Sequence, residues 1–378
     1  MKPRIGVLTN IPCPYSVELY DAIARRGCID LRVWYCAPRD TRRLWAQQHP
    51  QHWHRIGAGW HINHLYLDPR PARELLRWKP DLAVLSVYPI PVIQAAMWGA
   101  SWQGLPWVYW GEAVGAGGSG WLRRAGRRLA LLPARRWAEG FFAVGRKGME
   151  NFGAAFGADR PLLKVPWFSD LTRFAPVDGA RSRLEAGGTT FLYVGSFIPR
   201  KGVDLLARAF SDLVAVLPNV RLVVAGDGDP REHFDRHLSP AAAARVVRCG
   251  FIPWEGLPEL YRRADILVMP SRYDGWGLVI PEAMASGVPV IGSVDAGATL
   301  DLVREGVTGW RVRPADIAAL AAAMRRAAAL PDQALREMRT QCVVRARRCD
   351  VAVGARVFER AVRVVLNRLP VAGSPSRG

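Results

Sequence analysis

Cysteine is scarce in this sequence, and its first residues contain no long apolar run. Six cysteines in 378 residues are scattered without a C-x-x-C pair, which favours reduced thiols in a cytosolic protein. Met1 to Arg4 lead straight into an expected strand, so we expect no signal peptide. Residues 82–98 carry no charge, but they include two prolines and fall short of the roughly 18–20 residues of a membrane span. We therefore expect no transmembrane helix.

Acidic residues are also in short supply. The chain has 33 of them against 52 lysines and arginines, a net charge of +19. Residues 1–170 hold 23 basic and 12 acidic residues, a net +11, and 12 of the 15 tryptophans. This concentration of cationic and aromatic side chains indicates a partner that is anionic and partly hydrophobic.

Short apolar runs alternate with helix-like segments along both halves of the chain, a pattern typical of parallel sheets covered on both faces. We expect an α/β protein with an N-terminal domain over residues 1–170 and a C-terminal domain over 171–355. Residues 356–378 are expected to form a final helix and a tail. Strands are expected at residues 5–9, 31–36, 82–87, 107–110, 141–144, 191–195, 221–225, 246–249, 266–269 and 288–291.

Two carboxylates eight positions apart flank a glycine-rich turn in the C-terminal half. Asp274 begins the stretch Asp-Gly-Trp-Gly, and Glu282 follows near an expected helix start at Pro281. Glycines let backbone amides approach a ligand, and a helix N-terminus attracts a diphosphate. The carboxylates could then accept hydrogen bonds from sugar hydroxyls. The alternative is an ordinary strand, turn and helix with a solvated Asp274 and a Glu282 that stabilises the helix dipole.

A second cluster lies about seventy residues upstream. A strand ending at Gly195 and Ser196 is followed by Arg200 and Lys201, and residues 203–217 have helical periodicity. The two cations therefore stand where a strand end meets a helix start, which is where open α/β sheets bind ligands. Arginine and lysine at that position can neutralise phosphate oxygens.

These segments, in this order, resemble the family-4 retaining glycosyltransferases over residues 189–314. The resemblance implies two Rossmann-like parallel-sheet domains facing a cleft (GT-B), a nucleoside diphosphate sugar as donor, a hydroxyl acceptor, retention of configuration and no cofactor or essential metal. It assigns the departing diphosphate to Arg200 and Lys201, the donor sugar to Asp274 and the ribose to Glu282. It also implies that the last helix returns to the N-terminal domain. The remaining donor-binding positions are Gly195, Ser196, Phe251, Ile252, Gly275, Trp276, Gly277, Leu278 and Val279.

The sequence departs from the family's pattern at several places. Asp274 stands where relatives usually have Glu, and Ser196 stands where they often have Arg. Glu112 follows an expected strand where many relatives carry a His. Its carboxylate could accept the proton of the acceptor hydroxyl, or it could be a structural hydrogen-bond partner. The stiff segment Pro12 to Tyr15 replaces a glycine-rich loop and suggests an acceptor contact.

Residues 121–136 form a candidate membrane-binding segment. Apolar side chains at 122, 125, 129 and 132 alternate with arginines, and Trp121 opens the segment. An amphipathic helix of this kind can lie on an anionic membrane, and the alternative is a solvated basic face of the domain. The first interpretation predicts a lipid-linked acceptor, in polysaccharide, lipopolysaccharide or other glycolipid synthesis, and a cytoplasmic protein peripheral on the inner membrane face.

Other features carry weaker hypotheses. Five histidines between His49 and His64 show no zinc spacing, so we expect a polar or cleft-lining loop. The pair Asp227 and Asp229 is interpreted as a loop and not as a metal site. A sugar-nucleotide epimerase or hydrolase of the same fold is one functional alternative. A basic nucleic-acid-binding protein is another, but no DNA- or RNA-binding module is recognisable and we expect no nucleic acid partner.

Overall fold

The computed structural model describes residues 1–40, 48–57, 61–62, 65–114, 120–157, 159–176 and 188–369, without the side chains of residues 61, 62, 122 and 123. The chain forms two compact units. Unit 1 contains Met1–Phe168 and Val351–Gly378, and unit 2 contains Ser169–Asp350. The sequence placed these divisions after residues 170 and 355.

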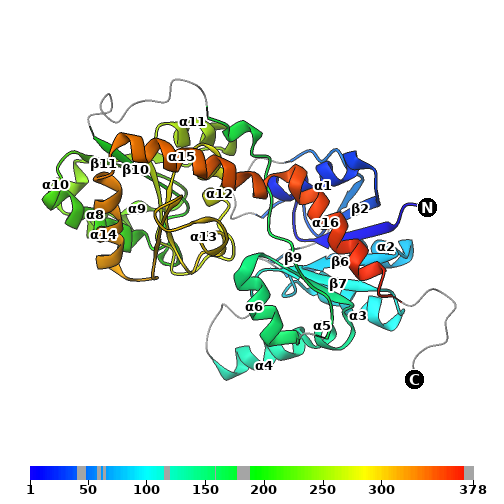
Figure 1. The fold of residues 1–378 in the computed structure, drawn as a ribbon. Helices are drawn as coiled ribbons and strands as arrows, with labels where there is room; N and C mark the ends of the chain where they lie inside the picture. Colours follow the sequence, from blue (N-terminus) through cyan, green and yellow to red (C-terminus); the bar gives the residue numbers. More distant parts are fainter. Residues whose placement is uncertain are drawn as a thin grey trace. The chain divides into compact units, whose positions relative to one another are not determined.

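Unit 1 is built on a parallel sheet, which in the described part of the chain has seven strands in the order β3-β2-β1-β6-β7-β8-β9 (Figure 1). A separate short hairpin joins β4 (His61–Ile62) to β5 (Leu65–Tyr66). The sheet strands are β1 (Arg4–Thr9), β2 (Asp30–Tyr35), β3 (His54–Ile56), β6 (Leu82–Ser86), β7 (Trp107–Gly111), β8 (Gly140–Ala143) and β9 (Leu162–Lys164).

The helices of unit 1 pack in pairs beside this sheet. The last helix, α16 (Val351–Leu366), lies along α1 (Pro14–Arg26), where Arg26 and Glu359 form an ion pair at 2.9 Å (Figure 1). The last helix is thus part of the N-terminal unit. The other helices are α2 (Arg70–Trp78), α3 (Pro91–Trp102), α4 (Trp121–Ala130), α5 (Leu132–Trp137) and α6 (Gly145–Phe156).

Unit 2 repeats the plan with a parallel sheet in the order β12-β11-β10-β13-β14-β15, six strands within the described residues. The strands are β10 (Thr189–Val194), β11 (Val220–Ala225), β12 (Val246–Gly250), β13 (Ile266–Met269), β14 (Val290–Ser293) and β15 (Gly309–Val312). The helices are α8 (Val203–Val216), α9 (Pro230–His233), α10 (Pro240–Ala243), α11 (Leu257–Arg262), α12 (Val279–Ala285), α13 (Gly297–Leu302), α14 (Ile317–Ala328) and α15 (Asp332–Ala346). Short 3-10 turns lie at Thr172–Phe174, Pro199–Lys201, Asp235–His237, Trp254–Gly256 and Arg347–Cys349.

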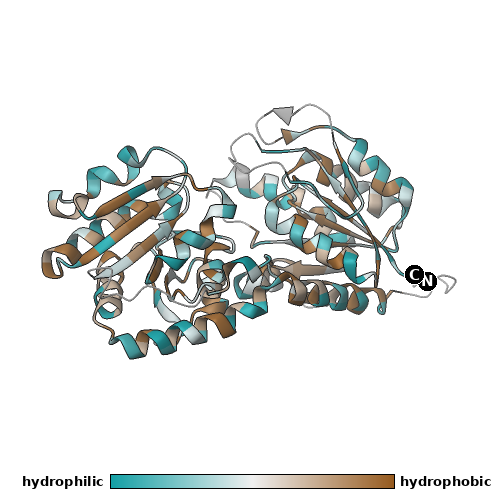
Figure 2. Ribbon diagram, turned by 90° about the horizontal axis from the view of Figure 1, so that it is seen from above, coloured by the Kyte–Doolittle hydropathy of each residue, from teal (hydrophilic) through white to brown (hydrophobic). Residues whose placement is uncertain are grey.

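The strands read as continuous apolar runs because both sheet faces are covered (Figure 2). All five residues of β6 and all four of β13 are buried. Each sheet is therefore the centre of its own hydrophobic core, and neither face of its middle strands is available to a ligand. Ligands must instead meet the loops at the strand ends.

Strand order changes direction once in each sheet. In unit 1 the chain moves outward from β1 through β2 to β3, then returns to place β6 on the other side of β1. In unit 2 the same reversal puts β10 beside β13. Open α/β sheets bind ligands outside the carboxyl ends of the two strands at such a reversal. In each unit, the expected ligand-binding edge is therefore the one formed by the carboxyl ends of the two strands at the reversal.

Most expected strands lie within two residues of an observed one, and three differences matter. The segment 121–136 is two helices and not one, because α4 ends at Ala130 and α5 starts at Leu132 with Pro133 in its first turn. The final helix, expected from residue 356, is α16 and begins at Val351. Short β3, β9 and β15 were not expected from the sequence. Residues 370–378, the end of the expected tail, lie outside the described residues.

Candidate active site

The strand reversal in unit 2 brings the two predicted clusters together. Lys201 follows β10 and Asp274 follows β13, and the Lys201 ammonium forms an ion pair with an Asp274 carboxylate oxygen. Asp274 is itself positioned from β14's loop, since its amide donates to Asp295 O at 3.0 Å and its carbonyl accepts from Gly297 N at 3.1 Å. Side chains 73 residues apart in sequence therefore share one edge.

Two glycines permit this close approach. Gly202 has φ of +70°, and a β-carbon there would lie 2.2 Å from Pro270 O. Gly277 has φ of +90°, and a β-carbon there would lie 2.6 Å from the Met269 methyl. At Gly202 the neighbour is backbone, so other residues are excluded by strain and by volume, whereas at Gly277 the left-handed backbone is the main constraint because the end of the Met269 side chain can move.

Arg200 and Arg272 lie at the same edge. Arg200 is exposed and donates to Tyr273 O at 3.0 Å, while Arg272 holds Asp204 by two bonds of 2.6 and 2.7 Å. Burial would raise the pKa of Asp204, but the hydrogen bond and charge of Arg272 hold it below its usual value. This pair was not predicted from the sequence, although an Arg after a strand and an Asp in the first turn of a helix are local signals.

Glu282 lies on α12 and is oriented from below by a buried tyrosine. Tyr261, fully buried, donates its hydroxyl to Glu282 Oε2 at 2.9 Å. Burial, and then the charge of Glu282, raise the pKa of Tyr261 well above its usual value, so the phenol remains a donor. The helix begins at Val279 and has only seven residues, so Pro281 lies inside it and not at its start.

The remaining predicted donor-binding residues lie in the loops at this edge of unit 2. Gly195 and Ser196 follow β10, and Ser196 O accepts from the Tyr193 hydroxyl at 2.8 Å. Phe251 and Ile252 follow β12 and are half-buried. Trp276 is buried at 2 % exposure, between half-buried Gly275 and the turn that enters α12. Leu278 is the N-cap of that helix.

A pocket of about 270 Å³ occupies the strand reversal of unit 1. Its walls come from the ends of β1, β6 and β7, from the first turns of α1 and from one further side chain, Trp167. Pro14 and Tyr15, expected in a loop, belong to the first turn of α1. The lining residues are Thr9, Asn10, Cys13, Tyr15, Ser16, Tyr20, residues 86–89, residues 109–113 and Trp167.

Glu112 lies in this pocket and is held by Trp167. The Trp167 indole N–H donates to Glu112 Oε1 at 3.0 Å, and the same ring lies 4.8 Å from Trp110 and 5.6 Å from Tyr15. The next turn is clamped by Asn151, which bonds both the amide and the carbonyl of Val114. Trp167 was not predicted from the sequence, because only the fold brings it to the end of β7.

Val87, which directly follows β6, has a strained backbone. Its φ of +61° is a left-handed conformation that a β-branched residue rarely adopts. Strain of this kind costs about 1–3 kcal/mol and tends to persist at functional sites. The strained residue and the next one, Tyr88, both line the pocket.

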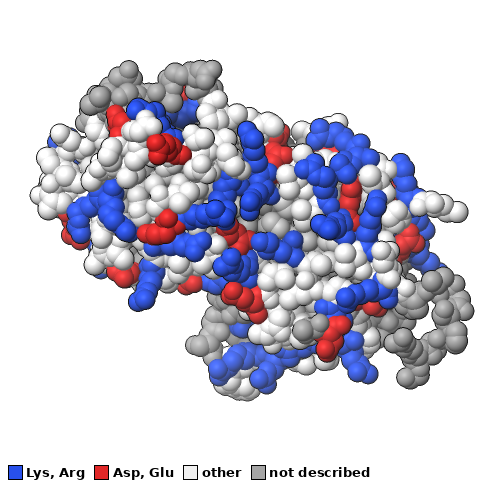
Figure 3. All heavy atoms as spheres, viewed as in Figure 1, with Lys and Arg blue, Asp and Glu red and all other residues white. Residues whose placement is uncertain are grey.

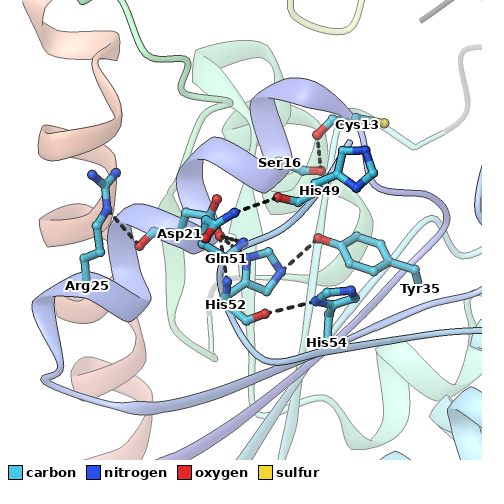
Figure 4. A network of polar contacts seen from close by, with 9 residues as sticks. All are labelled: Cys13, Ser16, Asp21, Arg25, Tyr35, His49, Gln51, His52 and His54. Atoms are coloured by element: carbon cyan, nitrogen blue, oxygen red, sulfur yellow. Dashed lines mark hydrogen bonds and ion pairs between the residues drawn. The ribbon is translucent and has the colours of Figure 1, made fainter. Parts of the chain in front are cut away.

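The histidine-rich segment is joined to α1 by hydrogen bonds among Asp21, Gln51 and His52, which we call the latch (Figure 4). His52, at 4 % exposure, contacts Asp21 through Nδ1 at 2.5 Å and the Tyr35 hydroxyl through Nε2 at 3.1 Å. Asp21 Oδ1 also accepts the amides of Gln51 and His52, both at 2.9 Å. The described histidines do not line the pocket, and His64 and the side chain of His61 lie outside the described residues.

Helix α4 exposes apolar and basic side chains together. Trp121 and Leu129 are 70 % and 68 % exposed, and Arg124 and Arg128 are exposed between them. Figure 3 shows blue side chains gathered over α4 at the lower edge of the molecule. Beside it, α5 and α3 add an aromatic cluster in which Trp98 contacts Trp102 and Trp137. We call α4, α5 and these tryptophans the α4–α5 surface.

Within the described residues, no group of three or more His, Cys, Asp or Glu side chains is arranged to hold a metal ion, and no helix is long and apolar enough to span a bilayer. Asp229, part of the expected loop, caps α9 by accepting from Arg231 N at 2.8 Å.

Comparison with known proteins gives matches in unit 2 and across the fold. Residues 188–329 match the family described as glycosyl transferases group 1. The chain is 33 % identical over 231 residues to a GDP-mannose-dependent alpha-(1-6)-phosphatidylinositol monomannoside mannosyltransferase of Mycolicibacterium smegmatis, covering 56 % of this chain and 60 % of that one. It is 37 % identical over 171 residues to a D-inositol 3-phosphate glycosyltransferase of Nocardia farcinica, covering 42 % of this chain and 38 % of the relative. The chain thus matches less than two thirds of the length of these relatives.

Solved structures are similar over nearly the whole chain. A sucrose-phosphate synthase from Thermosynechococcus elongatus aligns with a TM-score of 0.75 at 21 % identity, over 96 % of this chain and 99 % of that one. HepE of Anabaena in complex with UDP aligns with a TM-score of 0.75 at 18 % identity, over 96 % and 100 %. At these identities the likeness concerns the fold.

Proposed function

We propose that the chain, which matches the glycosyl transferases group 1 family over residues 188–329 and has the GT-B fold, transfers a sugar from a nucleoside diphosphate sugar to a hydroxyl acceptor, with retention of configuration. The relatives named above use GDP-mannose or act as inositol phosphate glycosyltransferases, and HepE was solved with UDP. They support a nucleotide-sugar donor for this chain as well.

The observation that carries the proposal is the Lys201–Asp274 ion pair at the strand reversal of unit 2. Sugar transfer leaves negative charge on the departing diphosphate, and fixed donors aimed at such charge are a large contribution to catalysis. Lys201 supplies a point charge already held in place by Asp274, and exposed Arg200 adds a planar fork. The backbone amides around Gly277 donate further hydrogen bonds to the phosphate oxygens.

The two carboxylates divide the sugars between them. Asp274 accepts hydrogen bonds from donor-sugar hydroxyls, and Glu282, oriented by Tyr261, accepts from the ribose. The reaction needs no carboxylate nucleophile, because the departing phosphate helps to remove the acceptor proton. No essential metal is required either, so we expect activity to survive chelation by EDTA.

Glu112 faces the acceptor from unit 1. A carboxylate within a pocket at the end of a parallel strand is positioned to accept a hydrogen bond from the attacking hydroxyl. Its own bond from Trp167 fixes the direction of that acceptance.

The test is a donor panel followed by product analysis. The preferred donor raises the melting temperature by mass action, and transfer to an acceptor gives a glycoside with the donor's anomeric configuration. Lys201→Ala should reduce the turnover number by about 10²–10³-fold, as loss of one charge-stabilising donor does, whereas Lys164→Ala on β9 should not.

Unchanged transfer in the Lys201→Ala variant would contradict the assignment. Release of free sugar or of an epimer without acceptor would favour the hydrolase or epimerase. Salt-sensitive oligonucleotide binding with no response to UDP or GDP would favour a nucleic-acid-binding protein.

The acceptor is lipid-linked, and the protein binds the inner membrane face through the α4–α5 surface. Exposed tryptophan and leucine beside clustered arginines suit an anionic bilayer, where each basic residue contributes about 1 kcal/mol. Gln94 couples this surface to the pocket, because its amide donates to Ala130 O of α4 at 2.9 Å and to Tyr88 O at 2.6 Å.

Sedimentation with vesicles tests the membrane surface. Vesicles of phosphatidylglycerol should bind the protein and vesicles of phosphatidylcholine should not, with binding reduced by salt. The double variant Arg124→Gln/Arg128→Gln should reduce binding at least tenfold, at about 1 kcal/mol per charge. Arg325→Gln/Arg326→Gln, an exposed pair on α14, is the matched control. Equal losses in both pairs would refute a specific docking surface.

A further inference from the structure

The pocket of unit 1 has a composition that restricts its ligand. Its described lining includes Tyr15, Tyr88, Tyr109 and Trp167 but no lysine, arginine or histidine. Its charged member is the carboxylate of Glu112. A pocket with aromatic walls and a few polar groups fits a small ring with hydroxyl edges and apolar faces.

The pocket is large enough for one ring. It measures about 270 Å³, which is sufficient space for a sugar or cyclitol ring.

Electrostatics then select among rings. A phosphate on the ring would share this small space with Glu112 and would lose its hydration without gaining a cation from the described lining. Arg127 of α4 does act on Tyr88: burial raises the pKa of that phenol and the charge of Arg127 opposes the rise. Arg127 is nevertheless not a lining residue, so its charge acts from outside the wall.

We propose that the pocket of unit 1 binds an uncharged polyol ring of the acceptor and discriminates against rings that carry a phosphate, with Glu112 as the discriminating group and Trp167 as its positioning residue. This inference rests on the proposed function and adds to it. The chain would thus differ in acceptor from its relatives whose names specify inositol 3-phosphate.

The positioning role follows from geometry. Trp167 donates to one carboxylate oxygen at 3.0 Å and lies against both Tyr15 and Trp110. The carboxylate is therefore fixed toward the pocket before a ligand arrives. Fixed acceptors bind hydroxyls at a smaller entropic cost than mobile ones.

Binding measured without any donor tests the inference separately from catalysis. Saturation-transfer NMR on the full chain would use methyl α-mannoside and myo-inositol as neutral probes, with mannose 6-phosphate and inositol 3-phosphate as charged counterparts. At least one neutral probe should bind about tenfold more tightly than its counterpart. Equal or tighter binding of both phosphates, or no binding of either neutral probe at tens of millimolar, would overturn the inference.

Variants assign the discrimination to its residues. Glu112→Gln keeps the shape and should remove most of the preference, so that the neutral and phosphorylated probes bind alike. Trp167→Phe keeps an aromatic ring but removes the N–H, and should weaken neutral binding several-fold. Trp53→Phe, at an exposed tryptophan away from the pocket, should change neither. A preference that persists in Glu112→Gln would show that the carboxylate does not discriminate.

Stabilisation by nucleoside diphosphates provides the separate readout. If donors stabilise the protein and Lys201→Ala abolishes that effect while the probes show no preference, the acceptor inference fails alone. If neither response occurs, the proposed function fails with it.

Discussion

At the strand reversal of unit 2 the chain carries Lys201 and Asp274 beside glycines, whereas at the reversal of unit 1 it carries tyrosines, tryptophans and Glu112. The two sheets have the same strand plan, so the plan fixes where a ligand binds but not what binds there. Cations and close-approaching backbone suit a diphosphate. Aromatic walls with one carboxylate suit an uncharged ring. One fold thus offers two edges of opposite chemistry.

Among the substitutions that test this comparison of the two units, Gly202→Ala should have the largest effect on stability. Gly202→Ala adds a β-carbon 2.2 Å from Pro270 O at φ of +70°, so we expect strain and a clash to destabilise unit 2 by about 3 kcal/mol or more. Gly104→Ala is the matched control, because Gly104 has φ of +63° but no atom within 4 Å. It should cost about 1–2 kcal/mol from strain alone. Urea unfolding measures both, and equal costs would show that crowding against β13 is unimportant.

Unit 1 relies on a buried polar latch where unit 2 relies on close backbone contact. Asp21→Asn removes the negative charge from a side chain that accepts three hydrogen bonds. We expect the free energy of unfolding to fall by about 2–3 kcal/mol. Asp212→Asn, at an exposed aspartate on α8, should cost less than about 0.5 kcal/mol.

The latch also predicts a pH dependence. Burial would raise the pKa of Asp21, but hydrogen bonds from His52 and Gln51 hold it below its usual value. Its stabilisation is therefore complete above the unfolded pKa of about 4 and is lost as the pH falls through the lower, folded pKa. Asp21→Asn should flatten stability against pH in that acidic range. A parallel curve for the wild type and the variant would contradict the latch.

The smallest effect is expected at strained Val87. Val87→Gly relieves a positive φ worth about 1–2 kcal/mol and loses a half-buried side chain of similar value, so stability should change by less than about 1 kcal/mol. Val84→Gly, at a fully buried position of the preceding strand β6, should cost about 3 kcal/mol. Similar losses at both positions would mean that Val87 is not strained.

Much of unit 2's edge could be predicted from local sequence. The glycines beside Asp274 and the cations after a strand each indicate a phosphate-binding site within a few residues of sequence. In the structure, Lys201 contacts Asp274. The pocket of unit 1 could not be predicted in the same way. Trp167 and Tyr15 are 152 positions apart, and no local pattern indicates that their rings lie 5.6 Å from each other.

By itself, the sequence determined the alternation of strands and helices, the apolar character of the buried strands and the positions of most strand starts, because each depends on neighbours along the chain. Tertiary structure alone decided the order of the strands, the meeting of Lys201 with Asp274 and the closure of Trp167 over Glu112. The physical reason is that a parallel sheet pairs strands through long crossovers. Side chains that make a site then come from loops whose separation in sequence carries no record of their contact.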